Sequence, residues 1–373
     1  MLNALGGKKT SKISLCSDCN NLFGAGPDKE LAESVSVLRN IAALPSGKNK
    51  PPPTIRKVKA DGMTYDIRSG GIPVLMPEHP LRDDGETVSI TARDEAHLDQ
   101  LLGALLAKKG VPEEKQNAVV DHFKKEATRT IGYAPPFNHS LSLGSELAQR
   151  SMIKACLVLW TECVGNHELK SARYDNARKF ALSGEMPQTE DTYPFIQADG
   201  RPADGFEGRF GANPNLIWVG SDANGRVLGY YRLYNAVGWA FELSLRGAPE
   251  SRQRSLISNP FSSSENEVGE MAQAHIDFQW VNDALKGDFN ETFKEAPKAI
   301  GALLKQAYEA SYDKELTLLI SEAFEALGLK EGDILDEAVL RQLAMQIAFR
   351  FTCLAQRIPR TEPLDGPSRL PWE

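Results

Sequence analysis

The stretch NLIWVGSDANGRVLGYYRLYNAVGWAFELSL at 215–245 decides the fold class, because aromatic and β-branched residues crowd it. Asn224-Gly225 lies between its first two apolar runs, and this dipeptide favours a type I′ hairpin turn. The stretch therefore predicts a three-stranded β-meander.

Helices are predicted just before the meander and a loop just after it. The apolar run ELAQRSMIKACLVLWTECVG predicts a helix around 145–164, and SARYDNARKFALSGE predicts a second one behind it. Residues 250–268 are rich in serine and are expected to form a loop. Residues 290–357 favour about three more helices, with breaks near Tyr312-Asp313 and at 328–333.

The N-terminal third favours a mixture of helices and strands. Asp28 is placed to cap a helix whose apolar positions run from Leu31 to Ile41. The prolines in PSGKNKPPPT (45–54) predict an extended linker. Residues 55–92 favour short strands, with a turn at Asp61-Gly62, and a helix is expected from Asp94 to Gly110.

Composition places the chain among ordinary globular proteins. It has 373 residues, of which 41% are apolar and 25% charged. It contains no apolar run long enough to predict a membrane-spanning helix, and its first residues lack the apolar core typical of a signal peptide. Five cysteines in a chain of this length do not predict a disulfide framework, so a cytoplasmic location with reduced thiols is expected.

Charge is distributed unevenly along the chain. The net charge is −7, yet residues 1–70 carry eleven Lys and Arg against six Asp and Glu. A basic end on an acidic body fits a small module that contacts phosphate groups, and a solvated segment that is basic by chance is the alternative.

The string LGGKKTSKISLCSDCNNLFG (5–24) carries the chemically informative motif. Cys16 and Cys19 have the spacing at which two thiolates reach one tetrahedral Zn²⁺, and they would supply half of its four ligands. A redox pair and a chance occurrence are the alternatives. The thioredoxin arrangement is disfavoured because no strand–motif–helix unit surrounds the pair.

This string resembles the second half of the ββα-metal motif in the zinc-knuckle branch of the HNH-type endonucleases. Leu5-Gly6-Gly7 matches that family's turn, and Leu15, Cys16, Cys19 and Asn20 match its second knuckle, with Gly24 as the later glycine. A looser resemblance extends over the helical pair and the meander, and so over most of residues 1–245.

The resemblance implies metal-dependent cleavage of DNA. Cys16 and Cys19 would hold a structural zinc, and Asn20 would bind a catalytic Mg²⁺ or Mn²⁺. Ser11 stands where the family has a middle Asn, and this departure puts the positioning of the motif's loop in doubt.

Five basic residues are candidates for contacting DNA phosphates. Arg150 and Lys154 lie four apart on the polar face of the predicted helix, where a solvated helix face is the alternative explanation. The other three flank the Leu-Gly-Gly turn and are Lys8, Lys9 and Lys12.

The general base that the family needs is absent from this sequence. A His should precede the Leu-Gly-Gly turn, but the first His is His79, and the first Cys-x-x-Cys is missing as well. We therefore expect no nuclease activity from these 373 residues, and we expect the missing motif to be encoded in frame before Met1. The alternative is a non-catalytic DNA-binding or interaction protein derived from such a nuclease.

A second cluster of possible metal ligands lies on the predicted helix. Cys156, Cys163 and His167 are spaced so that they share one face, and they could complete a zinc site. Core packing of the two cysteines is the favoured interpretation, because free cysteine is among the most buried residue types. The remaining histidines stand alone and are interpreted as structural or surface residues.

The predicted fold class is α+β. A partial ββα-metal zinc-knuckle module begins the chain, a mixed α/β middle contains the β-meander, and the C-terminus is helical. The predicted divisions are 1–45 for the nuclease module, 46–54 for a linker, 55–250 for an α+β domain, 251–357 for a mainly helical region and 358–373 for an extended tail.

Overall fold

The computed structural model of the chain divides into two compact units. Unit 1 comprises 1–58, 66–73 and 136–307, and unit 2 comprises 59–65, 74–135 and 308–373. This grouping differs from the sequence-based divisions, which stay a prediction. The structure describes residues 5, 16–83, 87–92, 95–126, 136–139, 141–187, 194–201, 203, 205, 210–211, 213–261, 268–269, 276–330 and 332–356.

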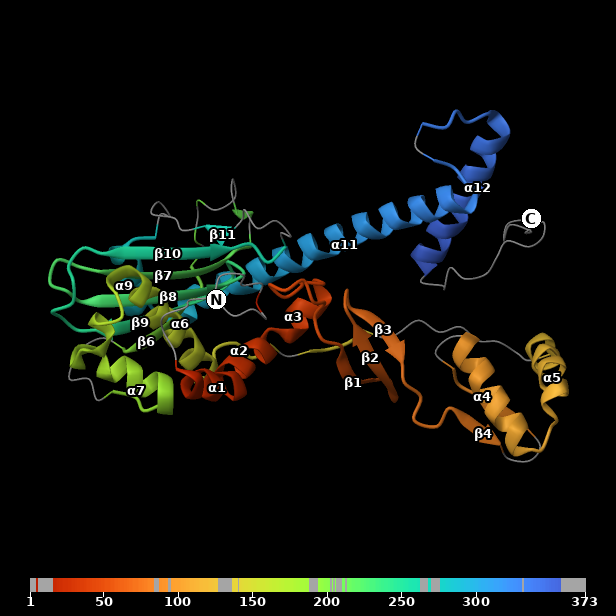
Figure 1. Cartoon of the computed structure of the whole chain (residues 1–373), viewed down its shortest axis with the longest axis horizontal. Helices are drawn as coiled ribbons and strands as arrows, with labels where there is room; N and C mark the ends of the chain where they lie inside the picture. The colour runs from red at the N-terminus through yellow and green to blue at the C-terminus, as the bar shows by residue number, and fades with distance from the viewer. Residues whose placement is uncertain are drawn as a thin grey trace. The chain divides into compact units, whose positions relative to one another are not determined.

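An antiparallel sheet of six strands forms the centre of unit 1, and its strand order is β11-β10-β7-β8-β9-β6. Figure 1 shows β10, β7, β8, β9 and β6 side by side in this order. The strands are β6 (Ile196–Asp199), β7 (Asn215–Ser221), β8 (Val227–Leu233), β9 (Val237–Ser244), β10 (Gln253–Ser258) and β11 (Val268–Gly269). The predicted meander is confirmed as β7, β8 and β9.

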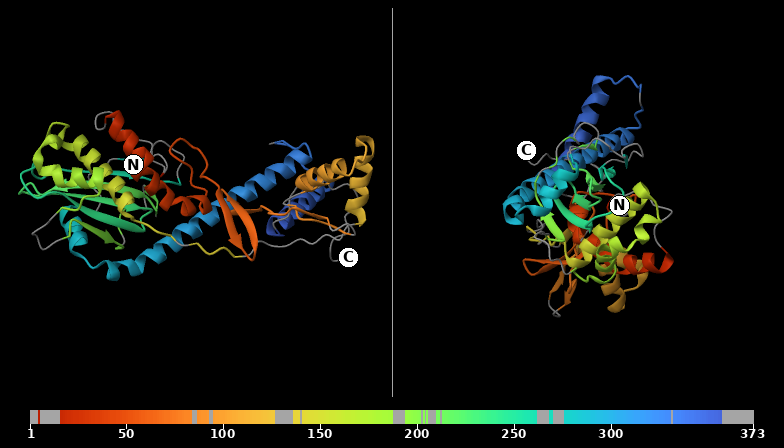
Figure 2. Two further views of the ribbon diagram at one scale, coloured as in Figure 1. Left: turned by 90° about the horizontal axis from the view of Figure 1, so that it is seen from below. Right: turned by 90° about the vertical axis from the view of Figure 1, so that its left-hand side faces the viewer.

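Both faces of this sheet are covered by helices (Figure 2), which is why every residue of β7 and β8 is buried. Helix α6 (Glu146–Val164) packs against β7, β8 and β10, and α9 (Phe278–Lys286) packs against β6, β8 and β9. Side chains alternate between the two layers: Ile217 and Val219 join the core cluster that includes α6, while Leu216 and Trp218 join the one that includes α9.

Helix α6 confirms the strongest helix prediction. Ser145 caps its N-terminus through a hydrogen bond from the backbone N–H of Ala148 to the Ser145 hydroxyl, and Gly165 ends it with φ +91°. Helix α7 (Asp175–Ser183) follows and ends at Gly184 in the left-handed conformation. The second helix of the predicted pair is therefore present, but it begins later than the sequence indicates.

The first turn of the meander differs from the sequence-based expectation. Asn224 does not adopt the positive φ that a type I′ turn requires, and only Gly225 does. The Asp222 carboxylate closes this loop by accepting hydrogen bonds from the backbone N–H groups of Asn224 and Arg226. Between β8 and β9, by contrast, Tyr234 and Asn235 both have positive φ, at 51° and 52°.

Three other predictions of local structure are wrong. Gln253–Ser258 is strand β10 rather than loop, because its apolar positions complete the two sheet faces. Helix α11 (Ala296–Ala326) runs through Tyr312-Asp313 without a break. Asp28 does not cap a helix, since α2 (Pro27–Ser34) already begins one residue before it.

The N-terminal segment contributes to the core of unit 1. Leu5 is 1% exposed and belongs to the same core cluster as α6. Its carbonyl oxygen accepts a hydrogen bond from Asn215 Nδ2 at 3.1 Å, while Asn215 Oδ1 accepts one from the backbone N–H of Tyr234 at 2.9 Å. A single buried amide therefore joins Leu5 to the start of β7 and to the residue that follows β8.

The remaining helices and strands belong to the two units. Asp61-Gly62 forms the predicted turn between the first two strands, and Gly110 follows the helix it was predicted to end. The elements are α1 (Ser17–Ala25), α3 (Ser36–Ile41), β1 (Ile55–Ala60), β2 (Met63–Arg68), β3 (Ile72–Leu75), β4 (Leu81–Asp83), β5 (Val88–Ile90), α4 (Glu95–Lys108), α5 (Glu113–Glu126), η2 (Glu168–Lys170), η3 (Ala172–Tyr174), α10 (Phe289–Thr292), η5 (Phe293–Glu295) and α12 (Glu337–Gln356). Among the described residues, every helix is too short or too polar to span a lipid bilayer.

The sheet approaches α6 closely at Gly229, and this residue provides a test of the packing. A Cβ at Gly229 would lie 2.9 Å from Cys156 Cβ, so we expect Gly229→Ala to destabilise unit 1 by about 1–3 kcal/mol. Gly24→Ala is the matched control, because a Cβ there meets no atom within 4 Å, and its effect should stay within about 1 kcal/mol. Urea unfolding followed by tryptophan fluorescence measures both variants. Equal effects would contradict this packing.

Candidate functional site

Cys16 and Cys19 lie together at the exposed N-terminus of α1. Cys16 is the N-cap residue, and its Sγ accepts a hydrogen bond from the backbone N–H of Cys19 at 3.3 Å. Neither cysteine is in a disulfide. The helix geometry therefore brings the two thiols of the motif to one side of one helix end, where solvent reaches Cys16.

The two thiols differ in acidity. The backbone N–H of Cys19 lowers the pKa of Cys16, because a hydrogen bond to sulfur stabilises the thiolate, and a hydrogen bond from the Cys19 thiol lowers it further. The same thiol–thiol bond raises the pKa of Cys19, which serves as the donor. Cys16 is thus the more acidic thiol of the pair, and a more acidic thiol forms the reactive thiolate more readily.

These two sulfur atoms fit half of a structural zinc site. Tetrahedral zinc takes four ligands, and thiolates at the end of a helix suit two of them. Among the residues that the structure describes, no group of three or more His, Cys, Asp or Glu side chains is arranged to hold a metal. Any further ligands would therefore have to come from outside the described residues.

Among the described residues, Asn20 does not have the neighbours that a Mg²⁺ or Mn²⁺ site needs. It is exposed on α1, and Asp18 lies two residues before it, on a different face of the helix. Hard divalent cations prefer several oxygen ligands, so one amide is insufficient. Leu5 and Gly24 of this motif are described, whereas Gly6, Gly7, Ser11 and Leu15, together with the candidate phosphate contacts Lys8, Lys9 and Lys12, lie outside the described residues.

Lys154 forms an ion pair inside the fold. Its Nζ lies 2.6 Å from both carboxylate oxygens of Asp28 and 4.8 Å from the centre of the Phe23 ring. Ser151 donates a further hydrogen bond to Asp28 at 2.6 Å. Desolvation lowers the pKa of Lys154, and the Asp28 carboxylate opposes this shift. These contacts attach α2 to α6, and they account for Lys154 without any nucleic acid.

Arg150 also makes contacts within the protein. Its guanidinium donates to the carbonyl oxygens of Ala181, at 3.1 Å, and Leu182. These carbonyls lie in the last turn of α7, where a cation is favoured by the helix dipole.

Cys156 behaves as a core residue, which confirms the favoured interpretation. It is fully buried, and burial raises the pKa of its thiol well above the ordinary value. Cys163 is half-buried and its pKa is also raised by burial, while His167 is exposed beyond the end of α6. In the described part of the chain, these three side chains do not form a metal site.

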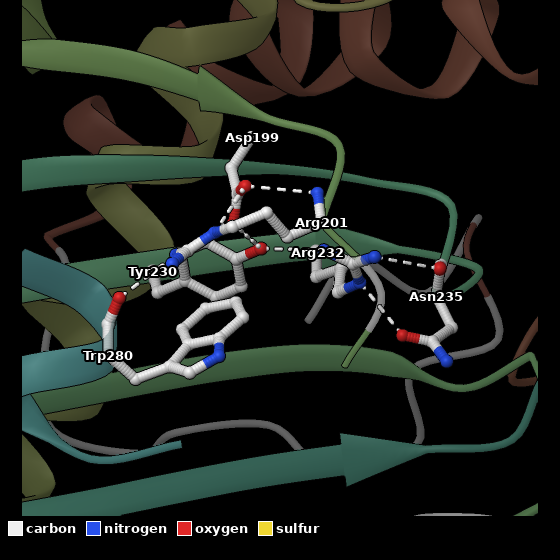
Figure 3. A network of polar contacts seen from close by, with 6 residues as sticks. All are labelled: Asp199, Arg201, Tyr230, Arg232, Asn235 and Trp280. Atoms are coloured by element: carbon white, nitrogen blue, oxygen red, sulfur yellow. Dashed lines mark hydrogen bonds and ion pairs between the residues drawn. The ribbon is translucent and has the colours of Figure 1, made fainter. Parts of the chain in front are cut away.

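A buried polar network under α9 was not predicted from the sequence (Figure 3). The Tyr230 hydroxyl donates to Asp199 Oδ2 at 3.0 Å and accepts a hydrogen bond from Arg232 at 2.7 Å. Arg232 also donates to Asn235 Oδ1 and to the Asn235 carbonyl oxygen, at 2.8 and 2.9 Å. Arg201 pairs with Asp199 and stacks on Trp280, with its guanidinium carbon 4.2 Å from the ring centre.

This network has a structural role and not a catalytic one. The acidic and basic groups partner one another, and burial raises the pKa of Tyr230 above its ordinary value. The sequence signal was present, since Arg232 interrupts an otherwise apolar strand and such a charge requires a buried partner.

The surface of unit 1 contains a shallow groove of about 400 Å³ beside the N-terminus of α9. Trp218, Phe278, Arg252 and Asp277 are among the residues that line it. Asp277 caps α9 by accepting a hydrogen bond from the backbone N–H of Trp280 at 2.8 Å, so its carboxylate is already engaged. The lining contains no thiol or imidazole.

Comparisons with protein-family models, with curated proteins and with solved structures find no match for this chain. The candidate site is therefore argued from its own residues alone. Within it, the Cys16–Cys19 pair has the side chains that could bind a metal or react.

The acidity of Cys16 can be tested by alkylation at different pH values. Because the backbone N–H of Cys19 is the main cause of the lowered pKa, Cys16 should react with iodoacetamide at pH values where an ordinary thiol is protonated. Cys19→Ala keeps that N–H, so Cys16 should retain most of its reactivity. Peptide mass spectrometry reads each cysteine separately, and buried Cys156 serves as the inert control. A Cys16 that reacts no faster than Cys163 would overturn the assignment.

The structural role of Lys154 can be tested by a double-mutant cycle. Lys154→Met leaves a half-buried carboxylate without its cation and should cost about 3 kcal/mol of stability. Adding Asp28→Asn should recover most of that loss, because no unpaired charge remains. Lys29→Met, in an exposed pair, should cost less than about 1 kcal/mol. Urea unfolding measures the wild type, Lys154→Met, Asp28→Asn, their double variant and the Lys29→Met control, and additive losses for the two partners would argue against the pair.

Proposed function

We propose that this chain acts on DNA as a protein of the HNH type, with residues 1–25 forming the second half of a zinc-knuckle nuclease module. In this proposal the 373-residue chain binds DNA without cutting it. The observation that carries the proposal is the pairing of the Cys16 and Cys19 thiols at the exposed end of α1.

The thiol pair supports a zinc knuckle better than it supports a redox centre. A helix N-terminus lowers the pKa of a thiol in both cases, so acidity alone does not discriminate. Asn20 directly after the second cysteine and the preceding Leu-Gly-Gly are the features that the HNH resemblance explains. Cys16 and Cys19 would hold the zinc, and a zinc bound there would order the helix end.

Burial of Leu5 also supports the proposal. The first residue of the Leu-Gly-Gly motif is held in the core by Asn215, so the motif begins at a fixed position on the sheet. A nuclease module needs such a rigid support, because its metal and base must meet the phosphate with a defined geometry.

The proposal excludes cleavage of DNA because these 373 residues lack groups that the hydrolysis of a phosphodiester needs. Hydrolysis of a phosphodiester needs a base to activate water, and such a base contributes about 10²–10⁴-fold. The sequence has no His before His79, and Asn20 alone does not suit a divalent cation. An interaction protein that does not bind DNA is the second candidate, and the incomplete set of metal ligands among the described residues favours it.

We expect the purified chain to bind duplex DNA with an affinity that falls steeply as salt rises, and to leave supercoiled plasmid intact with Mg²⁺ or Mn²⁺. Fluorescence anisotropy and gel electrophoresis measure the two properties. Metal-dependent nicking that Asn20→Ala abolishes would refute the non-cutting part, and an absence of DNA binding would favour the interaction protein.

Zinc binding by the thiol pair can be tested with Cys163 as a control within the same chain. Added Zn²⁺ should protect Cys16 and Cys19 from alkylation and should leave the rate at half-buried Cys163 unchanged. Equal protection of all three thiols, or of none, would count against a knuckle.

A further inference from the structure

Unit 1 carries a concentration of positive charge that the candidate site does not include. Five cations lie in residues 46–58 and 66–73, against one acidic residue, Asp66, while the whole chain has a net charge of −7. We call this group the basic ribbon, and its members are Lys48, Lys50, Arg56, Lys57 and Arg68, all of which are exposed.

The cations of the basic ribbon are not used to hold the fold together. Elsewhere in unit 1, Lys154, Arg201 and Arg226 pair with carboxylates at 2.6–3.0 Å. None of the five ribbon side chains forms an ion pair with any residue that the structure describes. They therefore remain available to an anionic partner.

The backbone around Lys57 increases this exposure. Lys57 has a left-handed φ of 58°, and its N–H donates to Asp66 Oδ1 at 2.9 Å. This irregularity places Arg56 and Lys57 both on the exposed side, where a regular strand would alternate them. The one acidic group of the segment is thereby engaged by a backbone N–H group.

Hydrogen bonds to Asn40 hold the backbone of the basic ribbon in place. This buried residue of α3 donates from Nδ2 to the carbonyl oxygens of Pro53, at 2.9 Å, and Ile67, at 3.0 Å. Its own backbone carbonyl oxygen accepts a hydrogen bond from the backbone N–H of Gly70 at 2.7 Å. The two segments that carry the cations are thus fixed to the same helix.

The two lysines that precede the prolines are also held. The backbone N–H of Ser46 donates to the carbonyl oxygen of Lys50 at 2.8 Å, and Lys50 N–H donates to the Ser46 hydroxyl at 3.2 Å. Pro52 is buried, which fixes the polyproline segment against the unit. A backbone fixed in this way loses little conformational entropy when a partner binds.

We propose that the basic ribbon binds the phosphate backbone of duplex DNA. This inference rests on the proposed function and names the surface of the chain that would perform it. Charge complementarity carries it, because a group of exposed Lys and Arg side chains without ion pairs to the described residues, on segments held by hydrogen bonds, suits a polyanion. Contacts of this kind position a protein on DNA without reading its sequence.

The test compares two variants with the same change in charge. The ribbon variant replaces the five cations by Gln: Lys48→Gln, Lys50→Gln, Arg56→Gln, Lys57→Gln and Arg68→Gln. The control replaces five exposed cations elsewhere on unit 1: Lys29→Gln, Lys170→Gln, Lys179→Gln, Arg246→Gln and Arg252→Gln. Circular dichroism and thermal melting establish that both variants keep the fold.

Fluorescence anisotropy with a mixed-sequence DNA duplex, read across a salt series, gives the result. The ribbon variant should bind at least about tenfold more weakly, and its salt slope should fall by about 0.9 for each phosphate group that it no longer neutralises. The control should stay near the wild-type chain in both respects.

The other outcomes overturn the inference in distinguishable ways. A wild-type chain that binds while the ribbon variant binds equally well rejects the ribbon and leaves the proposed function standing. Equal weakening of both variants reduces the effect to net charge and also rejects the ribbon. A wild-type chain that does not bind DNA rejects the proposed function and the ribbon together, as does preferential binding to anionic lipid vesicles.

Discussion

The architecture of unit 1 depends on covering both faces of one antiparallel sheet. Because β7 and β8 are buried along their whole length, each strand must supply apolar side chains in both directions, and each face needs its own helix. Helix α6 covers one face and α9 the other, and the N-terminal helices pack on the α6 side. This requirement explains why segments from the start, middle and later part of the chain meet in a single unit.

The charged groups of unit 1 differ in their partners according to whether they are buried or exposed. Charges that lie inside, such as Asp199 and Arg232, are connected through the Tyr230 hydroxyl, and Lys154 is paired with Asp28. An unpaired charge in the same places would be strongly destabilising. The cations of the basic ribbon, by contrast, are exposed and form no ion pair with the described residues, so pairing within the fold does not account for them. This difference separates a candidate binding surface from basic residues that merely look available.

The sequence predicted the features that local chemistry determines. Helix α6 has a strong apolar pattern and a capping serine, and the turn at Asp61-Gly62 has the residue types that left-handed conformations favour. Features that depend on distant partners were missed or misread. The serine-rich strand β10 is stabilised by pairing with β7, and the turn at Tyr234-Asn235 is supported by Asn215, whose Oδ1 accepts a hydrogen bond from the backbone N–H of Tyr234. At the candidate site, the spacing of Cys16 and Cys19 was informative, whereas the internal partners of Arg150 and Lys154 could not be read from one helix alone.

The ion pair between Lys154 and Asp28 joins positions that are 126 residues apart in the chain. Losing either partner leaves the other charged in a poorly hydrated place, whereas losing both leaves a neutral contact. Substitution at one position is therefore tolerated mainly when the other position changes as well. In a set of descendants of this protein, these two sites should vary together, as an Asp with a Lys or as two neutral residues. Such a correlation would record the contact between α2 and α6 in the sequences themselves.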